Sequence, residues 1–152
     1  MFRWATRQRL IKSSPLQDLQ APGSPTQRDR VLSDAEIGRI YKAACELGYP
    51  YGHICLIAIH TGMRRGEVGG LKWSYITPET ITLRAELTKN RREHVLPNLI
   101  GETFAQIART SEYLFPSSVD TPYSTWSDGK EALDALCAVD NFVFHDFRRY
   151  LS

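Results

Sequence analysis

The sequence predicts an α+β fold that is mainly α, with a helical core and a small antiparallel three-stranded sheet. Apolar residues recur with helical spacing through 31–73 and again after residue 99. Between these stretches, residues 80–96 alternate polar and apolar side chains with period two, as strands do. A chain of 152 residues is long enough for one domain with a buried core, and 42 % hydrophobic against 24 % charged residues is typical of a globular protein.

Residues 1–30 are expected to lie outside that domain. The segment 1–12 looks like the end of a helix, because aromatic and aliphatic residues alternate there with arginines. Proline, glycine and serine then interrupt regular structure throughout 13–30. We therefore interpret 1–12 as the tail of a missing N-terminal domain, 13–30 as a linker, and 31–152 as the main domain.

The first helix of the main domain has clear signals at both ends. Ser33 is a good N-cap residue, and Glu36 follows three positions later, which is the spacing of a capping box. Gly48 is a typical residue just beyond a helix C-terminus. These signals predict a helix from Ser33 to about Leu47.

The next helix is expected to be central. Residues 51–61 are apolar all round the helix, so no face of it can be left to solvent. Gly62 ends it, and a short third helix is expected over 64–73.

The second half of the chain is expected to hold the sheet and three more helices. Strands are expected at 80–83, 86–88 and 93–96, of which the last two form a hairpin around Lys89–Arg92. Helices are expected at 99–109, at 124–138 and from 145 onward.

Charge and composition indicate which classes of protein fit this sequence and which do not. The net charge is only +2, but residues 1–30 carry six basic and two acidic residues, and a second basic cluster occupies 84–94. Such patches suit a surface that follows phosphates, although two ordinary solvated faces would have the same composition. No apolar run reaches the roughly 20 residues that a membrane span needs, and the basic N-terminus lacks the apolar stretch of a signal peptide.

The three cysteines, Cys45, Cys55 and Cys137, are widely spaced and odd in number. They have neither the close pairing of a zinc site nor the even count of a disulfide framework. We expect them to be buried free thiols of a protein in a reducing cytoplasm.

Arg64 is the first candidate for chemistry. A guanidinium can donate two hydrogen bonds to the non-bridging oxygens of a phosphate and stabilise the charge that develops during reaction. Its place after Gly62, at the start of a helix, gives it a rigid base. The alternative is a surface ion pair with Glu67, three residues later. Glu67 could instead be a supporting residue that orients the helix or Arg64.

Lys89 stands at the tip of the predicted hairpin, where an ammonium can reach a leaving oxygen and donate a proton. Most lysines in turns are simply solvated, and that alternative stays open. The neighbouring Arg91 and Arg92 are candidates for contacts to a phosphate backbone, which position a protein without carrying sequence information.

His145 and Arg148 are three residues apart on a predicted helix, so their side chains emerge from one face. Histidine can move a proton near neutral pH, and Arg148 offers a second guanidinium for a phosphate. A histidine that caps a helix is the plainer interpretation of His145.

Taken together, these motifs resemble those of the tyrosine recombinases, the phage integrase family. The resemblance rests on Thr61-Gly62-x-Arg64-x-x-Glu67, on Lys89 in its hairpin, and on His145-x-x-Arg148. It implies that Arg64, Lys89, His145 and Arg148 are catalytic, that Arg91 and Arg92 bind DNA, and that 31–152 is a C-terminally truncated integrase catalytic domain. His53, His60 and His94 fall outside the matching positions and are interpreted as structural or surface residues.

The resemblance also implies a reaction. A tyrosine attacks a DNA phosphate and forms a phosphotyrosine intermediate, with double-stranded DNA and other recombinase protomers as partners and without metal, ATP or other cofactor. The location implied is the cytoplasm of a bacterium, on its nucleoid, for a bacterial or phage-encoded protein. The sequence has no tyrosine at the family's nucleophile position, because Tyr150 follows Arg148 too closely, so we expect these 152 residues alone to be inactive.

Two alternatives stay open at this point. One is a DNA-binding or interaction module without chemistry, and the other is topoisomerase-like breaking and rejoining of DNA strands.

Overall fold

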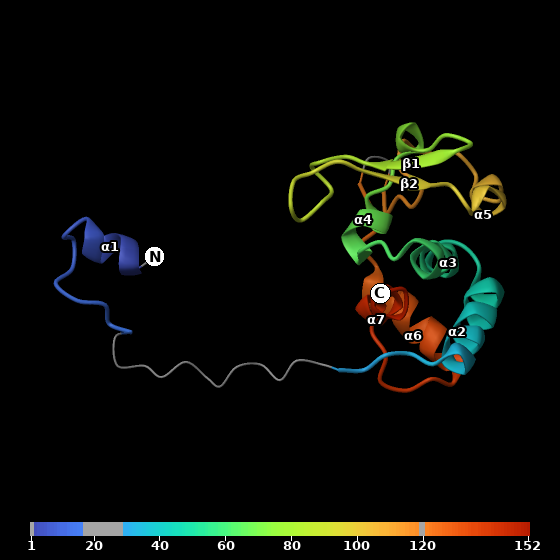
Figure 1. Cartoon of the computed structure of the whole chain (residues 1–152), viewed down its shortest axis with the longest axis horizontal. Coiled ribbons are helices and arrows are strands. Elements are labelled where there is room, and N and C mark those ends of the chain that lie inside the picture. Colours follow the sequence, from blue (N-terminus) through green and yellow to red (C-terminus); the bar gives the residue numbers. More distant parts are fainter. Residues whose placement is uncertain (1, 17–28, 119–120) are drawn as a thin grey trace.

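The structure is a computed structural model that describes residues 2–16, 29–118 and 121–152. Most of the predicted linker, 13–30, lies outside these residues. The elements, labelled in Figure 1, are helices α1 (Phe2–Arg7), α2 (Asp34–Leu47), α3 (Tyr51–Thr61), α4 (Arg65–Gly69), α5 (Gly101–Ala105), α6 (Trp126–Cys137) and α7 (Phe144–Tyr150), a 3-10 turn (Trp73–Tyr75), and strands β1 (Thr80–Leu83) and β2 (His94–Pro97).

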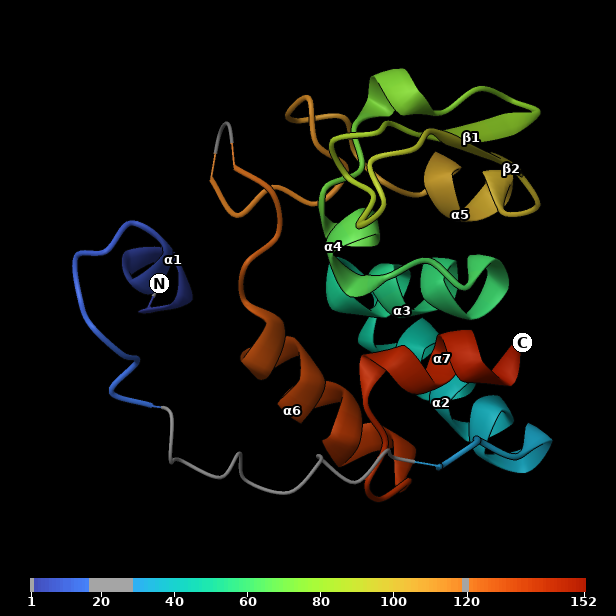
Figure 2. The same ribbon diagram turned by 60° about the vertical axis from the view of Figure 1, so that its left-hand side comes forward.

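Helix α3 is the centre of the main domain. Figures 1 and 2 show it between the β1–β2 sheet on one side and helices α2, α6 and α7 on the other. Every residue from Tyr51 to Ile59 is buried, as the all-round apolar sequence predicts. Because so many apolar side chains leave water along one helix, α3 is a firm support for the segments that begin at its C-terminus.

Helix α2 begins with the predicted capping box. The backbone N–H of Ser33 donates to Oε2 of Glu36 (2.9 Å), and the N–H of Glu36 donates to Oγ of Ser33 (3.3 Å). Arg30 adds an ion pair with the same carboxylate at 2.6 Å. The helix ends at Gly48, as predicted, where the backbone turns to a φ of +67°.

The predicted three-stranded sheet is wrong in one strand. Strands β1 and β2 pair with each other, antiparallel, with Leu83 opposite His94. Residues 86–88 instead belong to a turn, because the Thr88 hydroxyl accepts from the Arg92 N–H (3.0 Å) and donates to the Arg92 carbonyl (2.7 Å). That side chain takes the backbone groups that a strand partner would need. The fold class itself, mainly helical with a small antiparallel sheet, is confirmed.

Two helices are shorter than predicted. Helix α4 stops at Gly69, where the chain passes close to other elements. A Cβ on Gly69 would lie 2.6 Å from the Trp126 ring, and one on the following Gly70 would lie 2.7 Å from Leu87. Helix α5 ends at Ala105, where the backbone bonds tighten to i→i+3 spacing.

Two further sequence-based expectations concern the burial of the cysteines and the presence of membrane-spanning helices. Cys55 and Cys137 are buried free thiols as predicted, but Cys45 is exposed on α2, so that expectation is wrong for it. In the described parts of the chain, no helix combines the length and the apolar character needed to cross a membrane.

Gly62 joins α3 to α4, and a side chain at this position is expected to lower the stability of the fold. Its φ is +63°, which costs an L-residue about 1–2 kcal/mol, and an added Cβ would lie 3.3 Å from Cδ1 of Leu151. We expect Gly62→Ala to lower the free energy of unfolding, measured in urea, by at least that amount. The matched control is Gly38→Ala, inside α2 with open space around it, which should raise stability by about 0.5–1 kcal/mol. Equal effects at the two positions would contradict the expectation.

Candidate functional site

Arg64 lies at the junction between α3 and α4. Gly62 ends α3 in the left-handed conformation, and Arg64 is then the extended N-cap residue of α4, with φ of −72° and ψ of 153°. The buried α3 therefore holds the backbone of Arg64 in place, while its side chain stays 41 % exposed and available to a ligand.

Glu67 fixes the orientation of Arg64. Its carboxylate accepts the Arg64 backbone N–H at Oε2 (2.7 Å) and the Arg64 guanidinium Nη1 at Oε1 (2.8 Å). Glu67 is buried, with 4 % of its surface exposed, so this ion pair is shielded on one side. The predicted supporting contact is present, and the plain surface ion pair does not describe it, because a buried carboxylate here holds both ends of one residue.

Arg148 reaches the same place from the other end of the main domain. It lies on α7, and its Nη1 donates to the carbonyl oxygen of Gly62 at 3.1 Å. The neighbouring Phe147 is buried against Phe142 and Phe144, which anchors α7. A backbone carbonyl at the end of α3 thus sets the position of the second guanidinium.

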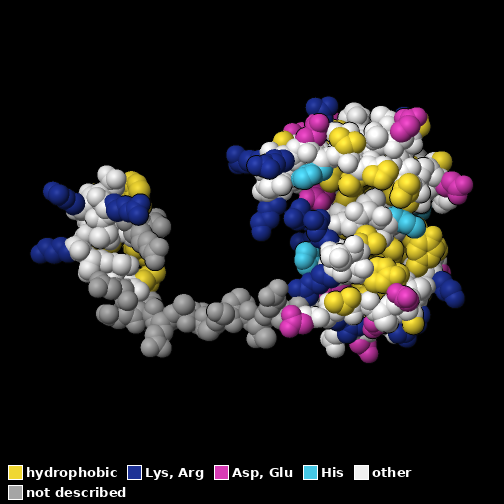
Figure 3. Space-filling model, viewed as in Figure 1, with side chains coloured by type: hydrophobic (Ala, Val, Ile, Leu, Met, Phe, Trp, Pro, Cys, Tyr) yellow, Lys and Arg dark blue, Asp and Glu magenta, His cyan; other side chains and the backbone are white. Residues whose placement is uncertain are grey.

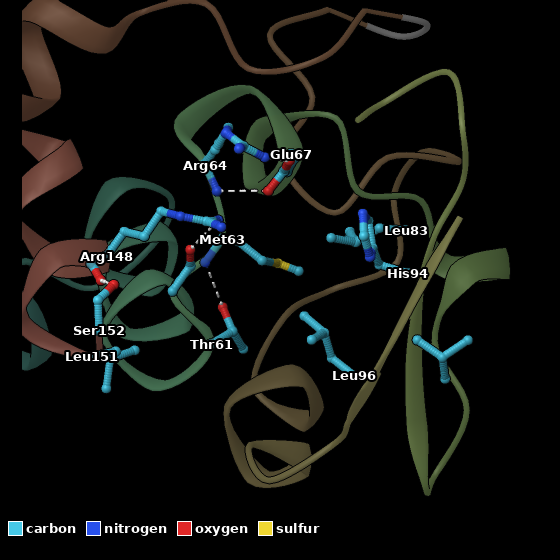
Figure 4. A pocket seen from close by; sticks show the side chains of 12 residues that line it. Thr61, Met63, Arg64, Glu67, Leu83, His94, Leu96, Arg148, Leu151 and Ser152 are labelled. Carbon is cyan, nitrogen blue, oxygen red and sulfur yellow. Dashed lines mark hydrogen bonds and ion pairs between the residues drawn. The ribbon is translucent and has the colours of Figure 1, made fainter. Parts of the chain in front are cut away.

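Arg64 and Arg148 line one pocket of about 290 Å³. Figure 4 shows the two arginines on one side of it, with Leu83, His94 and Leu96 of the sheet across from them. Two guanidiniums on a single wall suit an anion with more than one acceptor oxygen.

His145 also lies near Arg64. It lines a second hollow, of about 350 Å³, together with Val143 and Phe144, and Arg64 is part of its wall as well. Arg148 and His145, two of the other three predicted catalytic residues, therefore each share a hollow with Arg64, although they lie far from it in the sequence.

Lys89 lies outside this group. It is exposed on the turn between β1 and β2, beside the exposed Arg91 and Arg92, and it lines neither hollow. Figure 3 shows Lys, Arg and His side chains gathered along one edge of the main domain.

Comparison with known proteins decides the family. A family model described as the phage integrase family matches residues 30–152. The chain belongs to the phage integrase family.

Individual relatives agree with this assignment. A Haemophilus influenzae protein assigned as an integrase/recombinase is 33 % identical in an alignment of 100 residues that covers 57 % of this chain and 26 % of that protein. The chain thus spans about a quarter of the length of that curated relative.

Solved structures show the same fold. A lambda integrase dimer bound to a COC′ core site superposes with a TM-score of 0.71 and 22 % identity, over 98 % of this chain and 60 % of that one. A lambda integrase tetramer bound to a Holliday junction gives 0.69 and 22 %, over 98 % and 48 %. The integrase of mycobacterium phage Brujita gives 0.63 and 20 %, over 98 % and 52 %. At these identities the likeness establishes the fold of this integrase-family domain.

Two residues near the site of this integrase-family chain have other partners. The Arg65 guanidinium lies 5.2 Å from the centre of the Trp126 ring, so it packs on α6. The Tyr150 hydroxyl donates to Oδ1 of Asp34 at 3.1 Å, and this bond raises the pKa of the phenol above its ordinary value. Arg65 also lines the hollow beside His145, so the choice of Arg64 over Arg65 stays a prediction. Tyr150 packs against the hydrophobic core, which agrees with its interpretation as a packing residue.

His94 is exposed, which fits its interpretation as a structural or surface residue. It also lines the pocket opposite the two arginines, which the sequence analysis does not predict. A signal was present in the alternation of the strand: His94 and Leu96 are two apart and share one face, so the histidine occupies a position where an apolar residue is expected.

Proposed function

We propose that this chain is the DNA-binding catalytic core of a site-specific recombinase that cuts and rejoins double-stranded DNA through a phosphotyrosine intermediate. The observation that carries the proposal is the convergence of Arg64 and Arg148 on one pocket. A phosphodiester has two non-bridging oxygens, and two guanidiniums can hold both. The named lambda integrase structures are bound to a core site and to a Holliday junction, which supports DNA as the ligand.

The proposed reaction uses four residues of this chain. A tyrosine oxygen attacks the phosphorus as its hydroxyl proton passes to His145, the bond from phosphorus to the 5′ oxygen breaks, and that oxygen takes a proton from Lys89. Arg64 and Arg148 stabilise the negative charge on the non-bridging oxygens. Attack by a 5′ hydroxyl on the phosphotyrosine then rejoins the strand. Because Lys89 lies on an exposed turn, its part requires that the turn approach the bound DNA.

The attacking tyrosine is, in this proposal, not one of the seven tyrosines of the chain. All seven lie in described residues, and none of them lines either hollow beside Arg64. Tyr150 is held by Asp34, and its raised pKa makes it a poorer nucleophile. These 152 residues are therefore expected to bind DNA without cutting it.

We further propose that the protein assembles with other recombinase protomers on DNA. The lambda integrase structures are a dimer on a core site and a tetramer on a Holliday junction. The place of action would be the cytoplasm of a bacterium, on its nucleoid, for a bacterial or phage-encoded enzyme.

Binding to duplex DNA is the direct test, and it should depend steeply on salt. Each phosphate contact contributes about −0.9 to the slope of log affinity against log salt concentration. We expect an Arg91→Ala/Arg92→Ala variant to reduce the magnitude of that slope by about two, on duplexes of any sequence. Fluorescence anisotropy with a labelled duplex measures it, and Lys42→Ala, an exposed change on α2, is the matched control. Binding that does not respond to salt would contradict the proposal, and a denaturing gel should show no covalent product.

Replacing Glu67 separates orientation from simple charge. Removal of a negative charge near the pocket should strengthen DNA binding if only net charge matters. We expect Glu67→Ala to weaken binding instead, because Arg64 loses both hydrogen bonds that hold it, and to lower the unfolding free energy by about 1–3 kcal/mol. Glu93→Ala, an exposed change in the basic turn, should strengthen binding slightly. An affinity increase for both variants would show that Glu67 does not position Arg64.

A further inference from the structure

His94 lines the pocket of Arg64 and Arg148 from the side of the β1–β2 sheet. It is the first residue of β2 and pairs with Leu83 of β1. Figure 4 shows the imidazole across the pocket from Arg64 and Arg148, next to Leu83 and Leu96. Arginines thus form one wall, and His94 is the polar side chain of the wall opposite.

The surroundings of His94 favour an anion. The charged groups that line the pocket with it are Arg64, Arg148 and Glu67, and the Glu67 carboxylate is already occupied by Arg64. A ligand between the two walls would therefore meet the guanidiniums on one side and the imidazole on the other. An apolar residue at this strand position would leave that second side without a hydrogen-bond donor.

One ring nitrogen of His94 already has a partner. The side chain of Asn90 lies beside Nε2, with the amide nitrogen Nδ2 at 3.5 Å and the amide oxygen Oδ1 at 3.4 Å. Nε2 can therefore accept from the amide nitrogen or donate to the amide oxygen, according to the tautomer of the ring. Across the described part of the chain, Nδ1 has no hydrogen-bonding partner in the protein. Because a phosphate oxygen only accepts, a bound phosphate would favour the tautomer with the proton on Nδ1, in which Nε2 accepts from Asn90.

Asn90 also connects the pocket to the turn that carries Lys89. The turn is closed by Thr88, whose hydroxyl bonds both backbone groups of Arg92. Asn90 is the residue directly after Lys89, and His94 is the point where the chain leaves the turn and enters β2. A ligand held by His94 is therefore linked through one contact to the residue beside Lys89.

We propose that His94 is a third phosphate-binding side chain of this pocket. Its Nδ1–H donates to the DNA backbone opposite Arg64 and Arg148, while Nε2 accepts from Asn90 and positions the Lys89 turn over the same phosphate. This inference rests on the proposed function, because it takes DNA as the ligand of the pocket.

The test compares single variants of the chain in duplex binding at fixed salt. We expect His94→Ala to weaken binding about tenfold, as the loss of one hydrogen bond to a charged group does. The salt slope should change by less than the magnitude of about 0.9 expected for the loss of one charged phosphate contact. His94→Gln, whose amide can still donate, should recover part of the loss. His60→Ala, an exposed histidine on α3 that packs on Tyr41, is the control and should bind like the unsubstituted chain.

Nitrogen-15 spectra of the histidine rings give a readout that a merely structural role would not move. On addition of duplex, and of inorganic phosphate as a small probe, the Nδ1 signal of His94 should shift while the signals of His60 stay in place. If His94→Ala binds DNA normally while Arg64→Ala does not, the inference about His94 is wrong and the proposed function stands. If the unsubstituted chain binds no duplex at all, both are wrong.

Discussion

Replacing Arg64 with alanine is expected to reduce the affinity for duplex DNA by about a hundredfold. The variant loses a charge-assisted contact to phosphate, and such contacts are worth about 1.5–3 kcal/mol. It also leaves the carboxylate of Glu67 buried without its ion-pair partner, which disturbs the start of α4. Anisotropy titrations with a labelled duplex at one salt concentration measure the change.

The controls for this variant are its neighbours in sequence and in chemistry. Arg65→Ala should change the affinity only a few-fold, because that guanidinium lies against Trp126. Arg64→Lys keeps the charge but cannot bind two oxygens in parallel, so its affinity should lie between those of the unsubstituted chain and Arg64→Ala. Equal losses for Arg64→Ala and Arg65→Ala would mean that the pocket does not bind the phosphate.

Replacing Phe147 with alanine is expected to lower the free energy of unfolding by about 3–5 kcal/mol. Only 1 % of its surface is exposed, and its ring packs against Phe142 and Phe144 at centroid distances of 5.9 and 5.4 Å. The change removes a fully buried side chain of α7 next to Arg148. Urea unfolding followed by circular dichroism measures it.

Leu136 provides the matched control for that core substitution. It is 41 % exposed on α6, so Leu136→Ala should change stability by no more than about 0.5 kcal/mol. DNA binding by Phe147→Ala should also fall, since α7 carries Arg148 to the pocket. A Phe147→Ala variant as stable as Leu136→Ala would mean that α7 does not depend on this aromatic cluster.

Local signals in the sequence predicted the helices well where one residue type determines the conformation. The pair of Ser33 and Glu36 marked the start of α2, and Gly62 marked the end of α3, because caps and left-handed residues are short-range features. The prediction of a strand at 86–88 was wrong, because the alternation of polar and apolar residues cannot show that the hydroxyl of Thr88 will bond the backbone of Arg92.

The site was predictable in its parts but not in its assembly. Arg64 and Glu67 lie within one motif, and their contact follows from helical spacing. The bond from Arg148 to the carbonyl of Gly62 depends on the packing of α7 against α3, which no local pattern reveals. The place of His94 in the pocket wall depends likewise on which face of β2 turns toward the arginines, since the strand alternation shows only that His94 and Leu96 share a face.

The ion pair between Arg64 and Glu67 has a consequence for the entropy of binding. A long flexible side chain ordinarily loses much of its rotamer freedom when it captures a ligand, which weakens affinity by about 0.5–1.5 kcal/mol. In Arg64 that freedom is already lost on folding, because Glu67 holds both its backbone N–H and its guanidinium. A guanidinium has five N–H donors, so Arg64 can keep Glu67 and still offer the remaining ones to a phosphate. The side chain of Arg64 is thus already held in one geometry before a ligand binds.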